Sequence, residues 1–148
     1  MTWFFPDLNV WLALIVKAHP HNAPAWNWMN ALSQDDRFTF SRYTQLGILR
    51  LLTNDAAMGS QTLTLREAWD VYDDWLADPR VAFHAEPPGL DAAFRHATAP
   101  FLGKPATKWI GDCYLLAYAR QSGATLATFD RALLTLARKQ GCAAATPA

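Results

Sequence analysis

Three aspartates are the residues of this sequence whose type and position best suit chemistry. Asp112 lies at helical spacing from Leu115 and Leu116, so it falls on the apolar stripe of a predicted helix and not on its solvent face. Asp7 and Asp130 each follow closely on a short predicted strand, and open α/β sheets place their ligands at the carboxyl ends of strands. The three carboxylates are therefore candidates for one shared site.

The chemistry of such a site follows from the cost of burying a carboxylate, which needs a cation, a hydrogen-bond donor or water. If the three side chains converge, their oxygens suit Mg²⁺ or Mn²⁺, which can position a water, lower its pKa and stabilise charge developing on a phosphodiester. Without a metal, clustering raises the pKa of at least one acid. Two structural alternatives stay open: Asp112 could be stabilised by a helix dipole, and Asp130 could cap a helix.

Short strands alternating with helices must position these acids. One helix is predicted to start at an N-cap on Thr107 and to stop at Gly123, and the tail after Cys142 is either a short edge strand or frayed. Apolar periodicity and turn residues predict strands at 3–5, 38–40, 81–84 and 125–128. Further helices are predicted at 8–17, 23–32, 42 to about 53, 64–77 and 90–98, and a last helix starts before Ala132 and continues through 133–140.

This alternation predicts an α/β fold, with a mostly parallel sheet covered by helices on both faces. The 148 residues suit one domain, 1–148, and contain no repeat, low-complexity block or linker. No apolar run reaches the roughly 20 residues that span a bilayer, and the N-terminus lacks signal-peptide features. The two cysteines lack metal-ligand or redox spacing. We therefore expect a cytoplasmic protein without a membrane partner.

Net charge excludes nucleic-acid binding through bulk basicity, because 13 Lys and Arg are balanced by 13 Asp and Glu. Any contact with RNA must come from a local patch, and the candidates are Arg50, Lys108 and Arg131. Lys108 lies one helical turn before Asp112, and Arg131 adjoins Asp130. Ordinary solvated surface cations are the alternative for all three.

Three stretches carry a resemblance to a known family: FFPDLNVWLAL at the start, FSRYTQLGILRLLTN in the middle, and GDCYLLAYARQSGATLATFDRAL near the end. In order and spacing they resemble PIN-domain proteins of the VapC toxin family, the ribonuclease half of bacterial type II toxin–antitoxin pairs. The last stretch is the most specific. The resemblance implies a three-layer α/β/α fold, a mostly parallel sheet of about five strands, Mg²⁺-dependent RNA cleavage and inhibition by a cognate antitoxin.

Carried over by position, Asp7 resembles the family's first metal-binding acid. Asp112 resembles the acid at the start of the penultimate helix, and Asp130 the acid after the final core strand. Polar residues that line or support the acidic pocket in the family correspond to Asn9, Ser41 and Thr128.

The chain departs from the family at the second acid. A glutamate is usual six residues beyond the capping serine, but that position is Gly47, and the whole helix contains no acid. Gln45 is the nearest polar residue, and Glu86 is another acid near a strand end. We expect catalysis with one metal, or with a second recruited by RNA, in a pocket that carries one negative charge fewer.

Partners and rival functions follow from the remaining features. Trp11, Trp26 and Trp28 exceed what a small core needs, so a homodimer is expected, with a hydrophobic groove for an antitoxin segment. His19 and His21 form a solvated turn in preference to a metal site. The main alternative function is a catalytically impaired PIN fold that binds RNA or an antitoxin without cleavage. A receiver domain and a haloacid-dehalogenase-type phosphatase fit less well, because their characteristic aspartates are missing.

Overall fold

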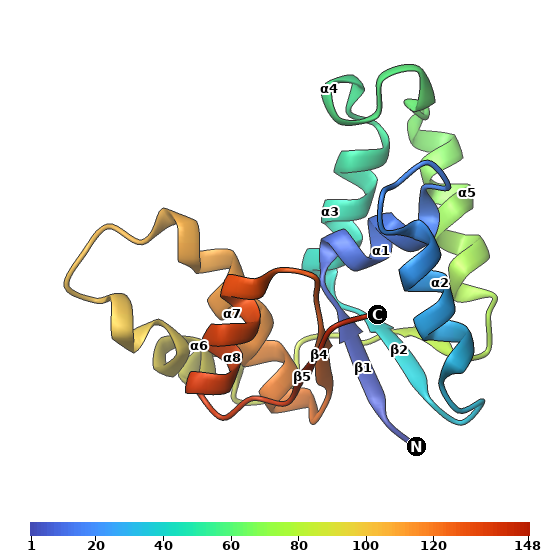
Figure 1. Ribbon diagram of the computed structural model, residues 1–148. Coiled ribbons are helices and arrows are strands. Elements are labelled where there is room, and N and C mark those ends of the chain that lie inside the picture. Colours follow the sequence, from blue (N-terminus) through green and yellow to red (C-terminus); the bar gives the residue numbers. More distant parts are fainter.

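The computed structural model describes residues 1–148 as five parallel strands in the order β3-β2-β1-β4-β5, flanked by helices on both faces (Figure 1). This is the predicted three-layer α/β/α arrangement. The strands are β1 (Trp3–Pro6), β2 (Arg37–Phe40), β3 (Val81–Phe83), β4 (Thr125–Ala127) and β5 (Ala144–Ala145).

The helices divide between the two faces of the sheet. In Figure 1, α1 to α5 lie on one side of the strands and α6 to α8 on the other. The bounds are α1 (Leu8–Ile15), α2 (Asn22–Ala31), α3 (Arg42–Leu52), α4 (Asp55–Met58), α5 (Leu65–Leu76), α6 (Leu90–Thr98), α7 (Thr107–Ser122) and α8 (Arg131–Lys139). Short 3₁₀ turns, η1 (Gly59–Gln61) and η2 (Ala99–Phe101), follow α4 and α6.

Alternation along β1 supplies both halves of the core. Phe4 belongs to a buried cluster with Trp11 and Phe40 on the α1–α5 side, whereas Phe5 belongs to a second cluster with Tyr118 on the α6–α8 side. Successive side chains of a strand point to opposite faces, so a central strand buried on both sides is apolar throughout. This explains why the sequence of β1 shows no alternation of polar and apolar residues.

Parallel pairing gathers the carboxyl ends of the strands at one edge. Pro6 of β1 is paired with Ala127 of β4, and the backbone N–H of Asp7 donates to the Ala127 carbonyl at 2.9 Å. Asp7 and Asp130 thus leave adjacent strands at the same edge, as their positions in the sequence predicted.

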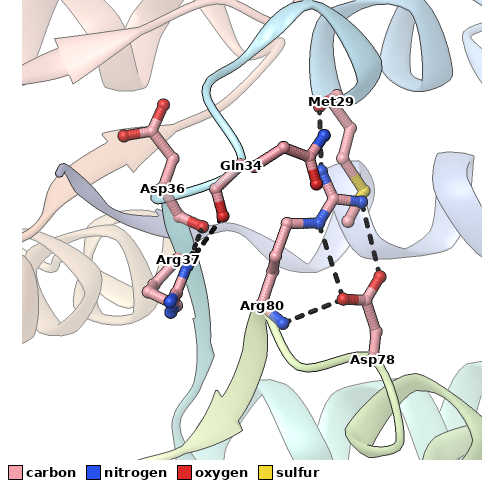
Figure 2. A network of polar contacts seen from close by, with 6 residues as sticks. All are labelled: Met29, Gln34, Asp36, Arg37, Asp78 and Arg80. Carbon is pink, nitrogen blue, oxygen red and sulfur yellow. Dashed lines mark hydrogen bonds and ion pairs between the residues drawn. The ribbon is translucent and has the colours of Figure 1, made fainter.

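A polar network holds the opposite, amino-terminal edge (Figure 2). The Arg80 guanidinium reaches both carboxylate oxygens of Asp78, at 3.5 and 3.4 Å, and the Met29 carbonyl at 3.4 Å. Arg37 donates to the Gln34 and Asp36 carbonyls. Both arginines make only contacts within the chain. They lie at the end of the strands opposite Asp7 and Asp130, so we assign them a structural role.

Local signals predicted most element ends correctly, with one correction at the start of α7. Gly123 ends α7 in the left-handed conformation at φ 68° as expected, but Thr107 is the first helical residue, and Ala106 precedes it without a side-chain cap. Helix α8 starts at Arg131 with Asp130 as its N-cap, one of the two roles left open for that residue. The chain after Cys142 forms β5, which pairs with β4, so it is an edge strand and not a frayed end.

The expectation that Trp11 and Trp28 lie at an interface was wrong. Trp11 is fully buried and stacks on Phe40, with 3.8 Å between ring centroids, and Trp28 is 8% exposed against Phe4 and Phe38. The small core absorbs both rings because the α1–α5 side is built largely from aromatic residues. Only Trp26 of the three has substantial exposure. None of the helices combines the length and apolar character that crossing a bilayer requires.

Candidate acidic site at the carboxyl edge of the sheet

Asp7 is the most deeply buried of the three aspartates, with 5% of its surface exposed. It caps α1: one carboxylate oxygen accepts the Val10 backbone N–H at 3.0 Å, and the other accepts the Thr128 hydroxyl hydrogen. Burial raises the pKa of Asp7 from its ordinary 3.8 to about 6, although these hydrogen bonds and one from the Asn9 backbone lower it, and the charge of Asp130 raises it further.

Thr128 links the two aspartates that end neighbouring strands. Its hydroxyl donates to Asp7 and accepts the backbone N–H of Asp130 at 3.0 Å. Asp130 is exposed, and one of its oxygens accepts the backbone N–H groups of Ala132 and Leu133 at the start of α8. The helix-cap alternative for Asp130 is therefore realised, and it leaves the second carboxylate oxygen without a protein donor.

Asp112 is half-buried in the second turn of α7. Burial raises its pKa, the charge of Asp130 raises it further, and the Lys108 ammonium one turn earlier lowers it. The negative charge of Asp130 thus raises the pKa of both other acids.

The three carboxylates do not form a closed metal cage. No three His, Cys, Asp or Glu side chains are placed so that together they could hold an ion. The donor chemistry nevertheless fits Mg²⁺, because every candidate ligand is a carboxylate oxygen and Mg²⁺ is commonly bound through one or two carboxylates while keeping several waters. Asp130 also has an oxygen to spare.

The other predicted supporting residues are placed differently from one another. Ser41 is fully buried and caps α3 through a reciprocal pair of bonds with Thr44, so its hydroxyl is directed at the helix start. The Asn9 side chain is exposed, and only its backbone N–H is bonded to Asp7. Among the three, Thr128 alone contacts an acid through its side chain.

The cation candidates are all exposed, and two adjoin the aspartates in the structure. Lys108 acts on Asp112, and its ammonium lies 5.1 Å from the Trp109 ring centroid. Arg131 opens α8 next to Asp130. Arg50 lies further along α3, where it lines a pocket of about 310 Å³ together with Leu8.

Gly47 occupies the position of the missing glutamate and faces the start of α1. A Cβ there would lie 2.7 and 2.9 Å from the two Leu8 methyl carbons, so the Leu8 side chain fills the space that a larger residue needs. Gln45 does not replace the acid, since its carbonyl oxygen accepts from Arg42. A residue larger than glycine at position 47 would therefore require the Leu8 side chain to move.

Replacing Gly47 with alanine should destabilise the protein by about 1 kcal/mol. Alanine gains roughly 0.5–1 kcal/mol of helix propensity, but overpacking against Leu8 costs about 1–3 kcal/mol. In a Leu8→Ala background the same change should instead stabilise. Urea unfolding of the four proteins measures the coupling, and identical effects of Gly47→Ala in both backgrounds would refute the contact.

Replacing Thr128 with valine should move the ionisation of Asp7 upward by about one pH unit. The lost hydrogen bond to a charged group is worth about 1.5–3 kcal/mol, and it favours the ionised carboxylate. The pH dependence of unfolding in EDTA reports this shift. Thr128→Ser should restore the original profile, whereas an unchanged profile in the valine variant would show that the hydroxyl does not act on Asp7.

Sequence reasoning missed a tyrosine cluster beside Asp112. The Tyr43 hydroxyl lies 2.5 Å from where a Cβ on Gly111 would be, and the Tyr43 ring packs 5.1 Å from that of Tyr114. Tyr114 donates to the Glu86 carboxylate at 3.1 Å, and burial raises its pKa above the ordinary value. Glu86 is therefore engaged by a phenol at the edge of the site. Nothing local in the sequence indicates this contact, because it joins α3, α7 and the loop after β3.

Comparison with known protein families gives one match over most of the chain. The PIN domain model matches residues 4–139. The chain is 40% identical over 130 residues to Ribonuclease VapC41 of Mycobacterium tuberculosis, in strains CDC 1551 and H37Rv, and the match covers 85% of this chain and 88% of that protein.

Solved structures share the fold at low sequence identity. The crystal structure of VapBC2 from Rickettsia felis bound to a promoter DNA fragment matches with a TM-score of 0.71 and 13% identity, over 98% of each chain. The structure of VapBC-1 from Haemophilus influenzae matches with a TM-score of 0.69 and 15% identity, also over 98% of each. Mycobacterium tuberculosis VapC20, a toxin that cleaves the sarcin-ricin loop, matches with 0.65 and 14%, over 89% of this chain and 93% of that one.

Proposed function

The chain belongs to the VapC family of PIN-domain proteins, and from that premise we propose that it is a Mg²⁺-dependent endoribonuclease, the toxin of a type II toxin–antitoxin pair. The 40% identity to a ribonuclease supports the activity. The single structural observation that carries the proposal is the acidic edge, where Asp7 and Asp130 follow adjacent parallel strands and are linked through the Thr128 hydroxyl.

Asp7, Asp112 and Asp130 would supply the carboxylate ligands; since no three side chains are placed to hold an ion together, the ion would bind one or two of them directly and reach the rest through water. Bound there, Mg²⁺ supplies a positive charge that stabilises the phosphodiester as negative charge develops on it, and it lowers the pKa of water. Mn²⁺ has the same preference for oxygen ligands and could substitute for it.

Hydrogen bonds within the protein orient the carboxylates of Asp7 and Asp130. Thr128 and the first turn of α1 fix both oxygens of Asp7, and their hydrogen bonds favour the charged form against burial. The cap at α8 fixes one oxygen of Asp130 and leaves the other for the site. Burial and the charge of Asp130 raise the pKa of Asp112, and the Lys108 ammonium offsets part of that rise.

RNA would approach through exposed cations around the aspartates, Arg131 and Lys108 nearest and Arg50 further along α3. Without an acid at Gly47, the pocket carries less negative charge against the phosphate backbone. A cognate antitoxin is the second partner, supported by structural relatives that were crystallised as VapBC complexes. The exposed apolar side chains Leu65 and Trp69 on α5 offer a surface for the proposed homodimer.

Cleavage of RNA by the purified chain tests the function. We expect cleavage in Mg²⁺ or Mn²⁺, loss of cleavage in EDTA, and recovery when the metal is returned. If neither metal supports cleavage of structured or single-stranded RNA, the enzymatic proposal fails.

A second candidate, an impaired PIN fold that binds RNA or antitoxin only, is favoured by Gly47 and by the absence of a closed metal cluster. Thermal unfolding separates the two functions. The nuclease should gain melting temperature on titration with Mg²⁺ or Mn²⁺, since a ligand that binds only the folded state stabilises it. An impaired binder should show no metal-dependent gain that Asp112→Asn removes.

A further inference from the structure

A groove of about 880 Å³ lies beside Asp130, between the start of α2 and helix α8. The chain after β5 runs toward α2 and closes it on a third side (Figure 1). The groove begins next to Asp130, because Phe129 and Arg131 belong to its lining. Its lining includes the side chains of His21, Phe129, Arg131, Thr135 and Arg138.

Helix α8 presents exposed polar side chains to this groove, beside the mostly buried Leu134. Arg131, Thr135 and Arg138 are spaced by four and three residues, so they lie on one face of the helix, and all three are exposed. The opposite face is buried through Leu133 and Leu136. The core therefore fixes which way the two arginines point.

Both arginines lack an acidic partner. The chain forms only two ion pairs, Arg80 with Asp78 and Arg95 with Asp91, and neither involves α8. No Asp or Glu side chain lines the groove, and the terminal carboxylate of Ala148, which does line it, pairs with neither arginine. In a chain with no net charge, this local excess is the kind of patch that attracts an anion.

A flat aromatic surface completes the lining. The rings of His21 and Phe129 stack with centroids 4.5 Å apart and an angle of 17° between their planes. His21 is exposed, whereas Phe129 is partly buried against the core, so the outer ring is held in place from beneath. Stacking platforms beside cationic side chains are typical of single-stranded nucleic-acid binding, because every base has a flat face.

We propose that this groove holds a single-stranded segment of RNA as it leaves the aspartate cluster, with phosphates against Arg131 and Arg138 and a base stacked on His21. The inference rests on the proposed ribonuclease function and extends its substrate contacts beyond the acids. Phosphates explain the unpaired cations, and a base explains the exposed ring, which an acidic polypeptide would not require.

Binding of a fluorescently labelled single-stranded RNA oligonucleotide tests this groove without cleavage, in EDTA and in the Asp112→Asn background. Arg138→Ala should weaken binding and reduce the slope of log affinity against log salt by about 0.7, the value for one phosphate contact on a single strand. His21→Ala should weaken binding at least about fivefold through lost stacking. Lys139→Ala is the matched control, since it removes an exposed charge from the same helix outside the groove.

The outcomes separate the groove from the catalytic proposal. Equal slopes for Arg138→Ala and Lys139→Ala, or unchanged binding by His21→Ala, would overturn the groove even if the wild-type chain cleaves RNA. If the chain binds RNA through the groove but never cleaves it, the groove proposal stands and the nuclease proposal fails. Unlabelled RNA and polyglutamate are compared as competitors. We expect unlabelled RNA to displace the labelled RNA and polyglutamate not to. Stronger displacement by polyglutamate would contradict the proposal.

Discussion

Replacing Asp112 with asparagine is expected to lower the rate of RNA cleavage by at least about 100-fold. Changes to residues that merely support a metal ligand already cost 10–100-fold, so loss of a ligand's charge should cost more. The fold should survive, because burial and the charge of Asp130 both raise the pKa of Asp112, and asparagine removes this unfavourable charge. Single-turnover cleavage at saturating Mg²⁺ measures the effect.

Asp70→Asn is the matched control for this variant. Asp70 is exposed on α5, and its replacement by asparagine removes one negative charge away from Asp7, Asp112 and Asp130. We expect wild-type cleavage from it. Equal rates for Asp112→Asn and Asp70→Asn would mean that Asp112 takes no part in the reaction.

The second large effect is on stability, where Asp7→Asn should make the protein more stable at pH 7.5 in EDTA by up to roughly 3 kcal/mol. The pKa of Asp7 is about 6 in the folded protein and 3.8 when exposed, and each pKa step is worth about 1.4 kcal/mol. Asparagine has no charge to bury and remains a good N-cap.

The sign gives a distinctive pH profile. A raised pKa means that the folded protein keeps a proton that the unfolded chain has already lost, so the Asp7 contribution is complete below about pH 4. It is lost as the pH rises through about 6. The stability of the wild-type chain relative to Asp7→Asn should therefore fall across this window and level off above it.

Urea unfolding of both proteins between pH 3.5 and 8 measures the difference. The pKa values of Asp112 and His19 are also shifted, but both groups are present in each protein and largely cancel in the comparison. The variant should also lose cleavage, so that higher stability accompanies lower activity. A difference that does not change with pH would show that Asp7 is not buried as a carboxylate with a raised pKa.

The secondary structure and the fold class could be read from local signals. Capping residues such as Ser41 and Thr64 start α3 and α5 as predicted, because a cap acts on the nearest helical turn. Errors arose where two signals competed, as at Thr107, where a good capping residue lies inside the helix. The short α4 was missed, since it is only four residues long and buries nothing.

The candidate site was only partly predictable. The placement of Asp7 and Asp130 at strand ends put them at one edge of a parallel sheet, and the contact of Thr128 with Asp7 agrees with its proposed supporting position. Local spacing could not show that Ser41 points into its own helix start, or that Glu86 is bonded to Tyr114. Such contacts depend on which loops become neighbours.

The amino-acid sequence alone determined the order of strands and helices, the three acids and the missing fourth at Gly47, because helix and strand periodicity, caps and residue types act over a few residues. Only the tertiary structure decided how deeply Asp7 is buried, that Leu8 fills the space beside Gly47, and that His21 meets Phe129 beside α8. These features depend on packing between segments far apart in the chain, and burial and electrostatic coupling exist only once that packing has formed.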